Sequence, residues 1–229
     1  MLWLEESEKD GIQSANPSQM LDYAYRIQCH NLPVEHAYLL AEAIRAILPW
    51  ISDEPSVGIH SIHVADSGNG WIRPTGENCK NLLYLSRRTR LVLRLSNDLI
   101  SKAQNLEGAT LIIDGNTLVV EKGKEKPLLP SSTLFARYIV MEEHDEETQF
   151  VSYLVNQLQH LNISPRKILC GQSHAIPTPK ALIHTRSALI AELNPAESLR
   201  LQQSGIGPNR QLGCGLFIPH KDIAPVSKP

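Results

Sequence analysis

Histidines on either side of one helix-length segment are the residues of this chain best suited to proton transfer. His36 follows Leu32 and Pro33, and the run Gly58-Ile59-His60-Ser61-Ile62-His63 carries two more. Histidine titrates near neutrality, so it can serve as a general base or a general acid. In an alternating strand His60 and His63 point to opposite faces, so only one of them reaches a given site.

We therefore predict proton-transfer roles for His36 and His60, with the hydroxyl of Tyr38 assisting. His63, His30 and Ser86 are alternatives. His36 also continues the apolar stripe of Leu40 and Ile44, so packing or capping is the structural alternative for it.

Arginines at positions 87, 88 and 90 form the densest basic cluster of the sequence. The planar guanidinium fork binds phosphate oxygens in pairs, so Arg87, Arg88 and Arg90 are predicted anion contacts. On a strand, Arg88 and Arg90 would face one side and Arg87 the other. The alternative is a solvated strand edge.

A glycine-rich loop lies near the end of the sequence, at residues 205–215. It contains Gly205, Gly207, Gly213 and Gly215 around Arg210. Glycine tolerates positive φ and allows a close approach of the backbone. Successive exposed N–H groups can form an anion nest. The pattern predicts a loop that binds an RNA backbone or makes a tight turn. It follows a helix and lacks a Gly-Lys-Ser/Thr step, which excludes Rossmann and Walker loops.

The four cysteines are too far apart for a zinc knuckle or a CxxC redox site: Cys29, Cys79, Cys170 and Cys214. We expect neither a metal site nor a cofactor.

The elements that would position these residues occur in the same order twice. In the first half we predict strands at 21–29 and 57–65, one or two strands within 82–95, a helix at 34–48 and another at 97–105, and a hairpin at 109–120. In the second half we predict strands at 133–141, 167–170, 182–193 and 216–218, and helices at 146–161 and 195–203, the latter capped by Asn194.

Strand-helix-strand-strand-helix-strand is the ferredoxin-like order. We therefore predict an α+β fold of two tandem ferredoxin-like (βαββαβ) domains with a cleft between their sheets. The predicted boundaries are a flexible acidic arm at 1–18, a domain at 19–123, a linker at 124–132, a domain at 133–221 and a tail at 222–229.

Charge is unevenly distributed along the chain. Residues 151–229 hold eight Lys or Arg and three Asp or Glu, a net of +5, whereas residues 1–150 have a net of −7. Phosphate binding depends on such local patches and not on the total charge of −2. The acidic start lacks a signal-peptide pattern, and no apolar run suits a membrane span, so we expect a cytoplasmic protein without a membrane partner.

Several motifs resemble one known family. The loop at 205–215 is similar to the C-terminal signature of the RAMP superfamily of CRISPR-associated proteins. The segments LPVEH (32–36), LSRRTRL (85–91), LCG (169–171), TRS (185–187) and GCGLFIPHK (213–221) resemble the myxobacterial-type variant of the CRISPR repeat-processing endoribonuclease. The resemblance covers residues 18 to 221.

The resemblance implies a substrate, a reaction and partners. Such enzymes cut precursor transcripts on the 3′ side of each repeat stem, without metal, by attack of the 2′-hydroxyl on the adjacent phosphate. The products carry a 2′,3′-cyclic phosphate and a 5′-hydroxyl. The enzymes often stay on the RNA as subunits of a type I CRISPR interference complex. The family's catalytic histidine lies near the first helix, which points to His36. The implied RNA contacts are Arg87, Arg88, Arg90, Arg186, Gly205, Gly207, Arg210, Gly213, Gly215 and Lys221.

Two other functions fit parts of the sequence. A RAMP scaffold subunit would keep the glycine loop and the arginines but leave the histidines idle. A duplicated ferredoxin-like enzyme acting on a small metabolite would need paired carboxylates or a cofactor loop, and the sequence offers neither. The charge run at 142–147 is typical of a solvated helix start.

Overall fold

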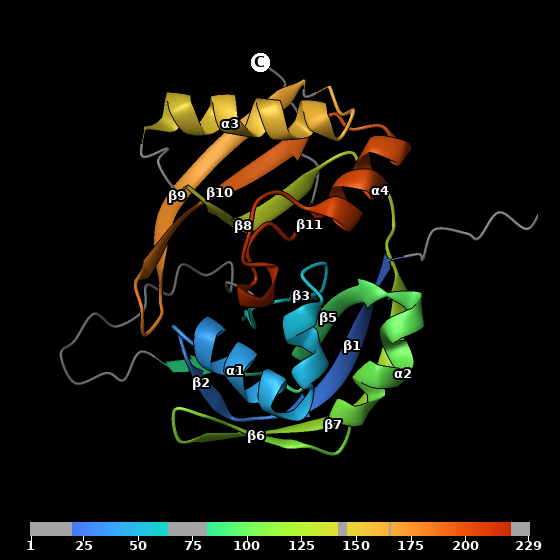
Figure 1. Cartoon of the computed structure of the whole chain (residues 1–229), viewed down its shortest axis with the longest axis vertical. Coiled ribbons are helices and arrows are strands. Elements are labelled where there is room, and N and C mark those ends of the chain that lie inside the picture. Colours follow the sequence, from blue (N-terminus) through green and yellow to red (C-terminus); the bar gives the residue numbers. More distant parts are fainter. Residues whose placement is uncertain (1–19, 64–81, 142–145, 165, 221–229) are drawn as a thin grey trace, which may run out of the picture.

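Two larger antiparallel sheets and one short sheet hold the strands of the computed structural model, which describes residues 20–63, 82–141, 146–164 and 166–220 (Figure 1). Five strands before residue 128 form one large sheet, and four strands after residue 133 form the other. Within the described ranges, no helix has the length and apolar character needed to cross a membrane. The predicted arm at 1–18 and tail at 222–229 lie outside these ranges.

The first sheet has the strand order β3-β5-β1-β7-β6. Its strands are β1 (Met20–Gln28), β3 (Gly58–Ile59), β5 (Arg90–Ser96), β6 (Thr110–Ile113) and β7 (Asn116–Pro127). Tyr23, Tyr25 and Ile27 of β1 alternate toward the core, as the sequence pattern predicts. β6 and β7 form the predicted hairpin, and Asp114 and Gly115 adopt the positive φ that a two-residue turn requires.

Helical segments cover one face of this sheet. They are α1 (Ala37–Ile47), η1 (Pro49–Asp53), η2 (Asn97–Leu99), α2 (Ile100–Ala103) and η3 (Gln104–Leu106). Leu40, Ala41 and Ile44 of α1 are fully buried, which matches the predicted apolar stripe. The helix starts after His36 and not at residue 34, because residues 31–33 form a strand.

The second sheet has the strand order β11-β8-β10-β9. Its elements are β8 (Leu134–Val140), α3 (Glu147–His160), β9 (Lys167–Pro177), β10 (Leu182–Ala191), α4 (Pro195–Ser204), η4 (Arg210–Leu212) and β11 (Ile218–Pro219). Phe150, Leu154 and Leu158 of α3 are buried, as predicted. Asn194 caps α4 in a capping box with Glu197, with Pro195 at the first helical position.

Several strand boundaries differ from the predicted ones. Residues 124–127, predicted as linker, belong to β7 and pair with residues 21–24 of β1. β9 continues past Cys170 to Pro177 and pairs with β10 along its length. Residues 31–33, which we assigned to no element, form β2 (Asn31–Pro33). This strand pairs with β4 (Leu82–Tyr84) in the short sheet. The strand predicted at 57–65 is reduced to β3, and residues 64–65 lie outside the described ranges.

The two halves share packing. Val140, Ile176, Leu212 and Cys214 of the second half belong to the buried cluster that fills the first half. A second cluster, built around Phe150 and Phe217, fills the space between the four-stranded sheet and its helices. The first cluster therefore fixes the second half against the first.

Candidate functional site

The glycine-rich loop at 205–215 forms a buried joint between the halves. Gly205, Gly207, Gly213 and Gly215 all have positive φ, as the pattern predicts. The loop's N–H groups bond mainly to nearby carbonyls, with Gly215 N–H donating to Tyr138 O at 2.7 Å. Those donors are therefore not the open anion nest that we predicted; they hold the loop in shape.

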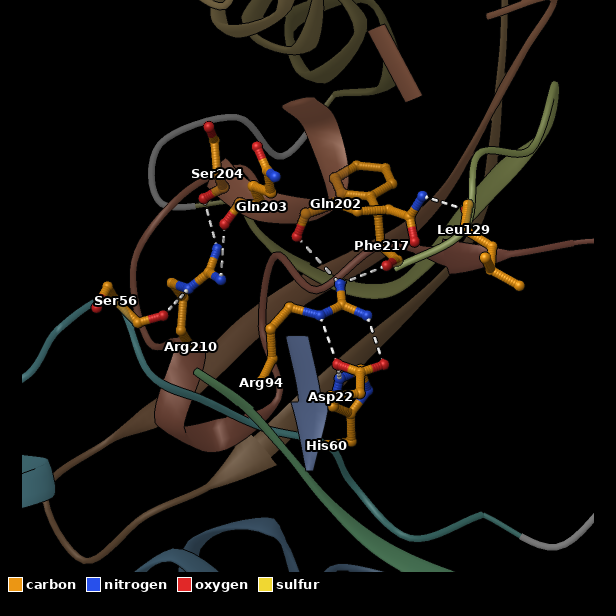
Figure 2. Close-up of polar contacts among 10 residues, drawn as sticks. All are labelled: Asp22, Ser56, His60, Arg94, Leu129, Gln202, Gln203, Ser204, Arg210 and Phe217. Atoms are coloured by element: carbon orange, nitrogen blue, oxygen red, sulfur yellow. Dashed lines mark hydrogen bonds and ion pairs between the residues drawn. The ribbon is translucent and has the colours of Figure 1, made fainter. Parts of the chain in front are cut away.

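Arg210 is only 8% exposed and binds carbonyl oxygens in both halves. Nε donates to Ser56 O at 3.0 Å, while the terminal nitrogens donate to Ser204 O and Gln203 O (Figure 2). Burial lowers the pKa of Arg210 to about 10, so the group stays charged at neutral pH. Arg210, one of the predicted RNA contacts, thus ties the loop to residue 56.

Arg94 makes a parallel connection beside it. The side chain is fully buried, and its guanidinium grips the Asp22 carboxylate at 2.8 and 3.0 Å. The remaining nitrogen donates to Gln202 O and Phe217 O, at 3.1 and 2.6 Å, in the second half (Figure 2). Such a paired and fully hydrogen-bonded buried charge fixes geometry across the joint.

His60, one of the predicted catalytic residues, belongs to this buried network. Its Nε2 lies 3.6 Å from Asp22 Oδ1 (Figure 2). Burial lowers the pKa of His60, and the adjacent Asp22 only partly opposes this. The ring therefore faces Asp22, and the His60 side chain is 18% exposed.

We expect Gly215→Ala to destabilise the protein strongly through this joint. A Cβ at Gly215 would overlap the carbonyl oxygen of Ile206, and the φ of 68° is strained for alanine. The expected loss is at least about 2 kcal/mol of unfolding free energy. Gly108→Ala is the matched control, because φ there is also positive but a Cβ meets nothing within 4 Å.

Chemical denaturation measures both variants. Gly108→Ala should lose about 1 kcal/mol from the backbone conformation alone. Equal losses in the two variants would contradict a close-packed loop.

His36, the first predicted catalytic residue, is the N-cap residue of α1 and is 2% exposed. Nδ1–H donates to Pro33 O at 2.8 Å and Val34 O at 3.1 Å, and Nε2 accepts from Ile62 N–H at 3.0 Å. Burial lowers the pKa of His36, which keeps the ring neutral. Both ring nitrogens are therefore engaged. The bond to Nε2 ties the start of α1 to the segment that bears His63.

A histidine cluster, defined as Glu35, His63, Tyr138 and His174, lies where α1, β8 and β9 meet. The ring of Tyr138 lies near both histidines, with its centroid 6.0 Å from that of His63 and 5.1 Å from that of His174. His174 Nε2 contacts Glu35 Oε2 at 3.2 Å. Two imidazoles, one of them oriented by a carboxylate, therefore share one site at the edge of the joint.

His63 is the more exposed of the two histidines in this cluster. Partial loss of hydration and the charge of the neighbouring Arg137 lower the pKa of His63 below its ordinary value. The neutral form, which can accept a proton, therefore predominates at pH 7.

Two of the three predicted arginines, Arg87 and Arg90, line a groove on the first half. Residues 86–89 form a turn closed by Thr89 N–H donating to Ser86 O, so Arg87 and Arg88 are not on a strand as predicted. Both side chains are exposed. The groove has a volume of about 870 Å³. Its basic lining residues are Arg26, His30, Arg87 and Arg90, and its acidic lining residue is Glu121.

The other predicted site residues fall in different places. Tyr38 is partly buried against the first core, and Ser86 accepts from Arg88 N–H in the turn. Arg186 contacts Glu147 at 3.3 Å and lies over Phe150, on the helix side of its sheet. Lys221 lies outside the described residues. Among the described residues, no three His, Cys, Asp or Glu side chains gather to hold a metal ion.

Tyr138 and His174 are the members of the histidine cluster that sequence reasoning missed. The strand predicted at 167–170 stops four residues before His174. The alternation of residues 172–176 with Ile176 pointing inward was the signal that the strand continues. Tyr138 carried no such signal, because only the packing of the halves brings it to His63.

Comparisons with known proteins agree on one family. The family model described as Cas6 Crispr matches residues 21–222. The CRISPR-associated endonuclease Cas6 of Myxococcus xanthus (strain DK1622) is 27% identical over 199 residues, covering 87% of this chain and 81% of that protein.

Two solved structures share the fold. One is described as CRISPR associated protein Cas6, with a TM-score of 0.60, 12% identity, and coverage of 89% of this chain and 100% of that one. The other is described as a RAMP protein binding different RNA substrates, with a TM-score of 0.56, 14% identity, and coverage of 86% and 98%.

Proposed function

Because the chain belongs to the Cas6 family of CRISPR-associated proteins, we propose that it is an endoribonuclease that binds CRISPR repeat RNA and cuts the precursor transcript within its repeats. The observation that carries this proposal is the family match over residues 21–222, which spans both sheets and the joint. The relative from Myxococcus xanthus, itself named an endonuclease, supports it.

The proposed reaction is attack of a 2′-hydroxyl on the adjacent phosphate. The 2′-oxygen forms a bond to phosphorus as a base removes its proton, and the bond from phosphorus to the 5′-oxygen breaks as an acid protonates that oxygen. The products are a 2′,3′-cyclic phosphate and a 5′-hydroxyl. These steps need two positioned proton-transfer groups and positive charge near the phosphate, and no metal ion takes part.

The histidine cluster supplies both groups. We assign the base to His63, which is exposed and neutral at pH 7, and the acid to His174, which Glu35 orients. Arg137, whose charge acts on His63, is placed to offset the charge of the phosphorane. Tyr138 contacts both rings and helps to position them.

The three predicted catalytic residues take other places in this proposal. His36 becomes a positioning residue, because its bond from Ile62 N–H holds the strand end that leads to His63. His60 maintains the joint beside Asp22 and Arg94. Tyr38 stays a candidate hydroxyl donor beside Glu35 and His36 on the start of α1.

RNA phosphates are proposed to follow the basic groove from Arg26 to Arg87. We expect the double substitution of Arg26 and Arg87, two exposed lining residues, by Gln to weaken binding of repeat RNA and to flatten its salt dependence. The slope of log K against log salt should fall by about one for each phosphate that the variant no longer binds. Filter binding across a salt series measures this slope.

The double substitution of Lys122 and Lys124 by Gln is the matched control. It removes the same charge from the exposed side of β7, outside the groove. A slope unchanged in the arginine variant, or reduced equally in both variants, would contradict specific binding of phosphates at the groove.

The fold supports an interpretation as two ferredoxin-like units. In each large sheet the first strand of the unit lies between the last and the third, as in β7-β1-β5-β3 and β11-β8-β10-β9. We propose that residues 19–127 and 133–221 are the two units, with β6 as an addition to the first.

We further propose that the product stem stays bound and carries the protein into a type I CRISPR interference complex.

Cleavage of a repeat from the host's own CRISPR array tests the function directly. The protein should cut that RNA at a single phosphate and leave a scrambled RNA of equal length and composition intact. Binding of the repeat without any cut would contradict the nuclease and favour a scaffold subunit. Equal cutting of both RNAs would contradict repeat recognition.

A further inference from the structure

One face of the four-stranded sheet carries an apolar row that the proposed reaction does not use. The row consists of Ile218, Phe135, Leu189 and Leu169, one residue from each strand. Ile218 pairs with Phe135, Phe135 with Leu189, and Leu189 with Leu169. Directly paired residues of antiparallel strands point to the same face, so the four side chains form one line across the sheet.

This face lies opposite the helices of its half. Leu134, Ala136, Ala188 and Ile190, the neighbours along the strands, pack into the core with α3 and α4. Figure 1 shows α3 over the other side of β8, β9 and β10. At the two ends of the row, Ile218 is 41% and Leu169 is 44% exposed. In the middle of the row, Phe135 is partly exposed and Leu189 is 9% exposed. The row is therefore apolar, open at its two ends, and lies on the face that α3 and α4 do not cover.

The surroundings of the row are basic. The four strands, all within the described residues, contain no Asp or Glu, and their Arg and Lys residues are Arg137, Lys167 and Arg186, the last of which lies on the helix side. Arg137 and Lys167 are exposed. The Arg137 guanidinium lies 5.8 Å from the centre of the Phe135 ring, and the His220 ring lies at the same centroid distance. An apolar strip with an aromatic ring and cationic edges matches unpaired bases and their phosphates.

The row is also continuous with the histidine cluster. Phe135, Arg137 and Tyr138 all lie on β8, and the ring of Tyr138 is near both proposed catalytic histidines. Three residues of a strand span roughly 10 Å. Nucleotides next to the cut phosphate therefore reach the row without leaving the protein surface.

We propose that the apolar row binds unpaired nucleotides flanking the cleaved phosphate, with one base stacked on Phe135 and the backbone held by Arg137 and Lys167. This inference rests on the proposed function, because the histidine cluster must hold the cut phosphate. The face thus distinguishes a repeat stem that continues into a single strand from a stem that ends at the cut.

The test compares two synthetic repeat RNAs, each with a single 2′-deoxy nucleotide at the cut to prevent cleavage. One ends at the stem, and the other continues into a short unpaired extension beyond the cut. Wild-type protein should bind the extended RNA more tightly, by about five-fold to a hundred-fold for one stacked base. Phe135→Ala should remove this gain and leave binding of the stem unchanged.

A second variant changes the charge at the edge of the row at an exposed position, so the fold should be kept. Leu169→Glu places an acid on the acid-free sheet at an exposed position and should abolish the gain, whereas Leu169→Lys should preserve it. Ile112→Ala is the control, because Ile112 is a 60% exposed apolar residue of the other sheet. Thermal unfolding confirms that each variant is folded.

The outcomes separate the two proposals. Equal affinity of wild-type protein for both RNAs, with repeat cleavage intact, would overturn the inference and leave the proposed function standing. A gain that survives Phe135→Ala and Leu169→Glu would also overturn it. Self-association that Leu169→Glu disrupts would assign the row to a second copy. Failure to bind either RNA would overturn the proposed function itself.

Discussion

Replacing His63 by alanine is expected to lower the single-turnover rate of repeat cleavage by about 10²–10⁴-fold while RNA affinity stays unchanged. His63 is the exposed imidazole of the histidine cluster, and its lowered pKa provides the neutral base at pH 7. Removal of that base leaves the arginine groove and the joint intact, so binding should persist. Quenched-flow or manual time courses at saturating protein measure the rate, and a parallel binding titration measures the affinity.

Two other histidine variants serve as the control and as the comparison for His63→Ala. His160→Ala removes an exposed imidazole at the end of α3, remote from the cluster, and should cleave at the wild-type rate. His36→Ala removes the bond from Ile62 N–H, so it should lose unfolding free energy as well as rate. Full activity of His63→Ala, together with an inactive but stable His36→Ala, would return the chemistry to the start of α1.

The pH dependence of the cleavage rate tests the assignment of His63 as the base in a second way. A base with a lowered pKa keeps its function until the pH falls below the usual histidine value of about 6.5. The wild-type single-turnover rate should therefore hold from pH 8 to below pH 6.5 before its acid limb begins. An acid limb that begins above pH 7 would contradict the assignment.

Replacing Arg94 by methionine is expected to cost about 3–5 kcal/mol of unfolding free energy. The substitution leaves the Asp22 carboxylate without its cation and two carbonyl oxygens, of Gln202 and Phe217, without their donor. Stabilities of whole domains are about 5–15 kcal/mol, so the loss is a large fraction of the total. Urea denaturation monitored by tryptophan fluorescence measures it.

Glu42→Gln provides the contrast, because the Glu42–Arg45 pair lies on the surface with half of Glu42 exposed. Its expected loss is below about 1 kcal/mol. The double variant of Asp22→Asn and Arg94→Met should lose less than the sum of the single losses, because neither partner is left charged alone. A loss below 1 kcal/mol for Arg94→Met would contradict the role of the joint.

The same pair sets the acid stability. Burial by itself would raise the pKa of Asp22, but the adjacent His60 and Arg94 groups lower it well below its usual range. A lowered folded pKa gives stability that is present above the unfolded value of about 3.9 and is lost as the pH falls through the folded value. Wild-type stability should therefore drop in acid below pH 4, and Arg94→Met should show a flatter dependence there.

Local patterns were enough to predict most elements of the fold. The spacing of Leu40 and Ile44 predicted α1, the Asn194-Pro195 step predicted the start of α4, and Asp114-Gly115 predicted the hairpin turn. These features depend on neighbours in sequence, so they can be identified without the fold. Strand lengths were less predictable, because β7 and β9 extend only where a partner strand supplies hydrogen bonds.

The site was harder to predict because its interactions join distant residues. His36 matched a proton-transfer role by residue type, yet its nitrogens bond to Pro33, Val34 and Ile62. Arg210 matched a phosphate-binding role, yet it bonds to Ser56, 154 positions away. Residue type therefore predicted the chemistry available to the chain, and only packing decided which side chains reach the surface.

The most direct test of the account is the cleavage of a host repeat RNA in EDTA, beside the same RNA with a single 2′-deoxy nucleotide at the cut. We expect the protein to cut the all-ribose RNA without metal, leaving a 2′,3′-cyclic phosphate, and to leave the substituted RNA whole. Cleavage of the substituted RNA at the same phosphate, or a cut that requires an added divalent metal, would contradict attack by the 2′-hydroxyl.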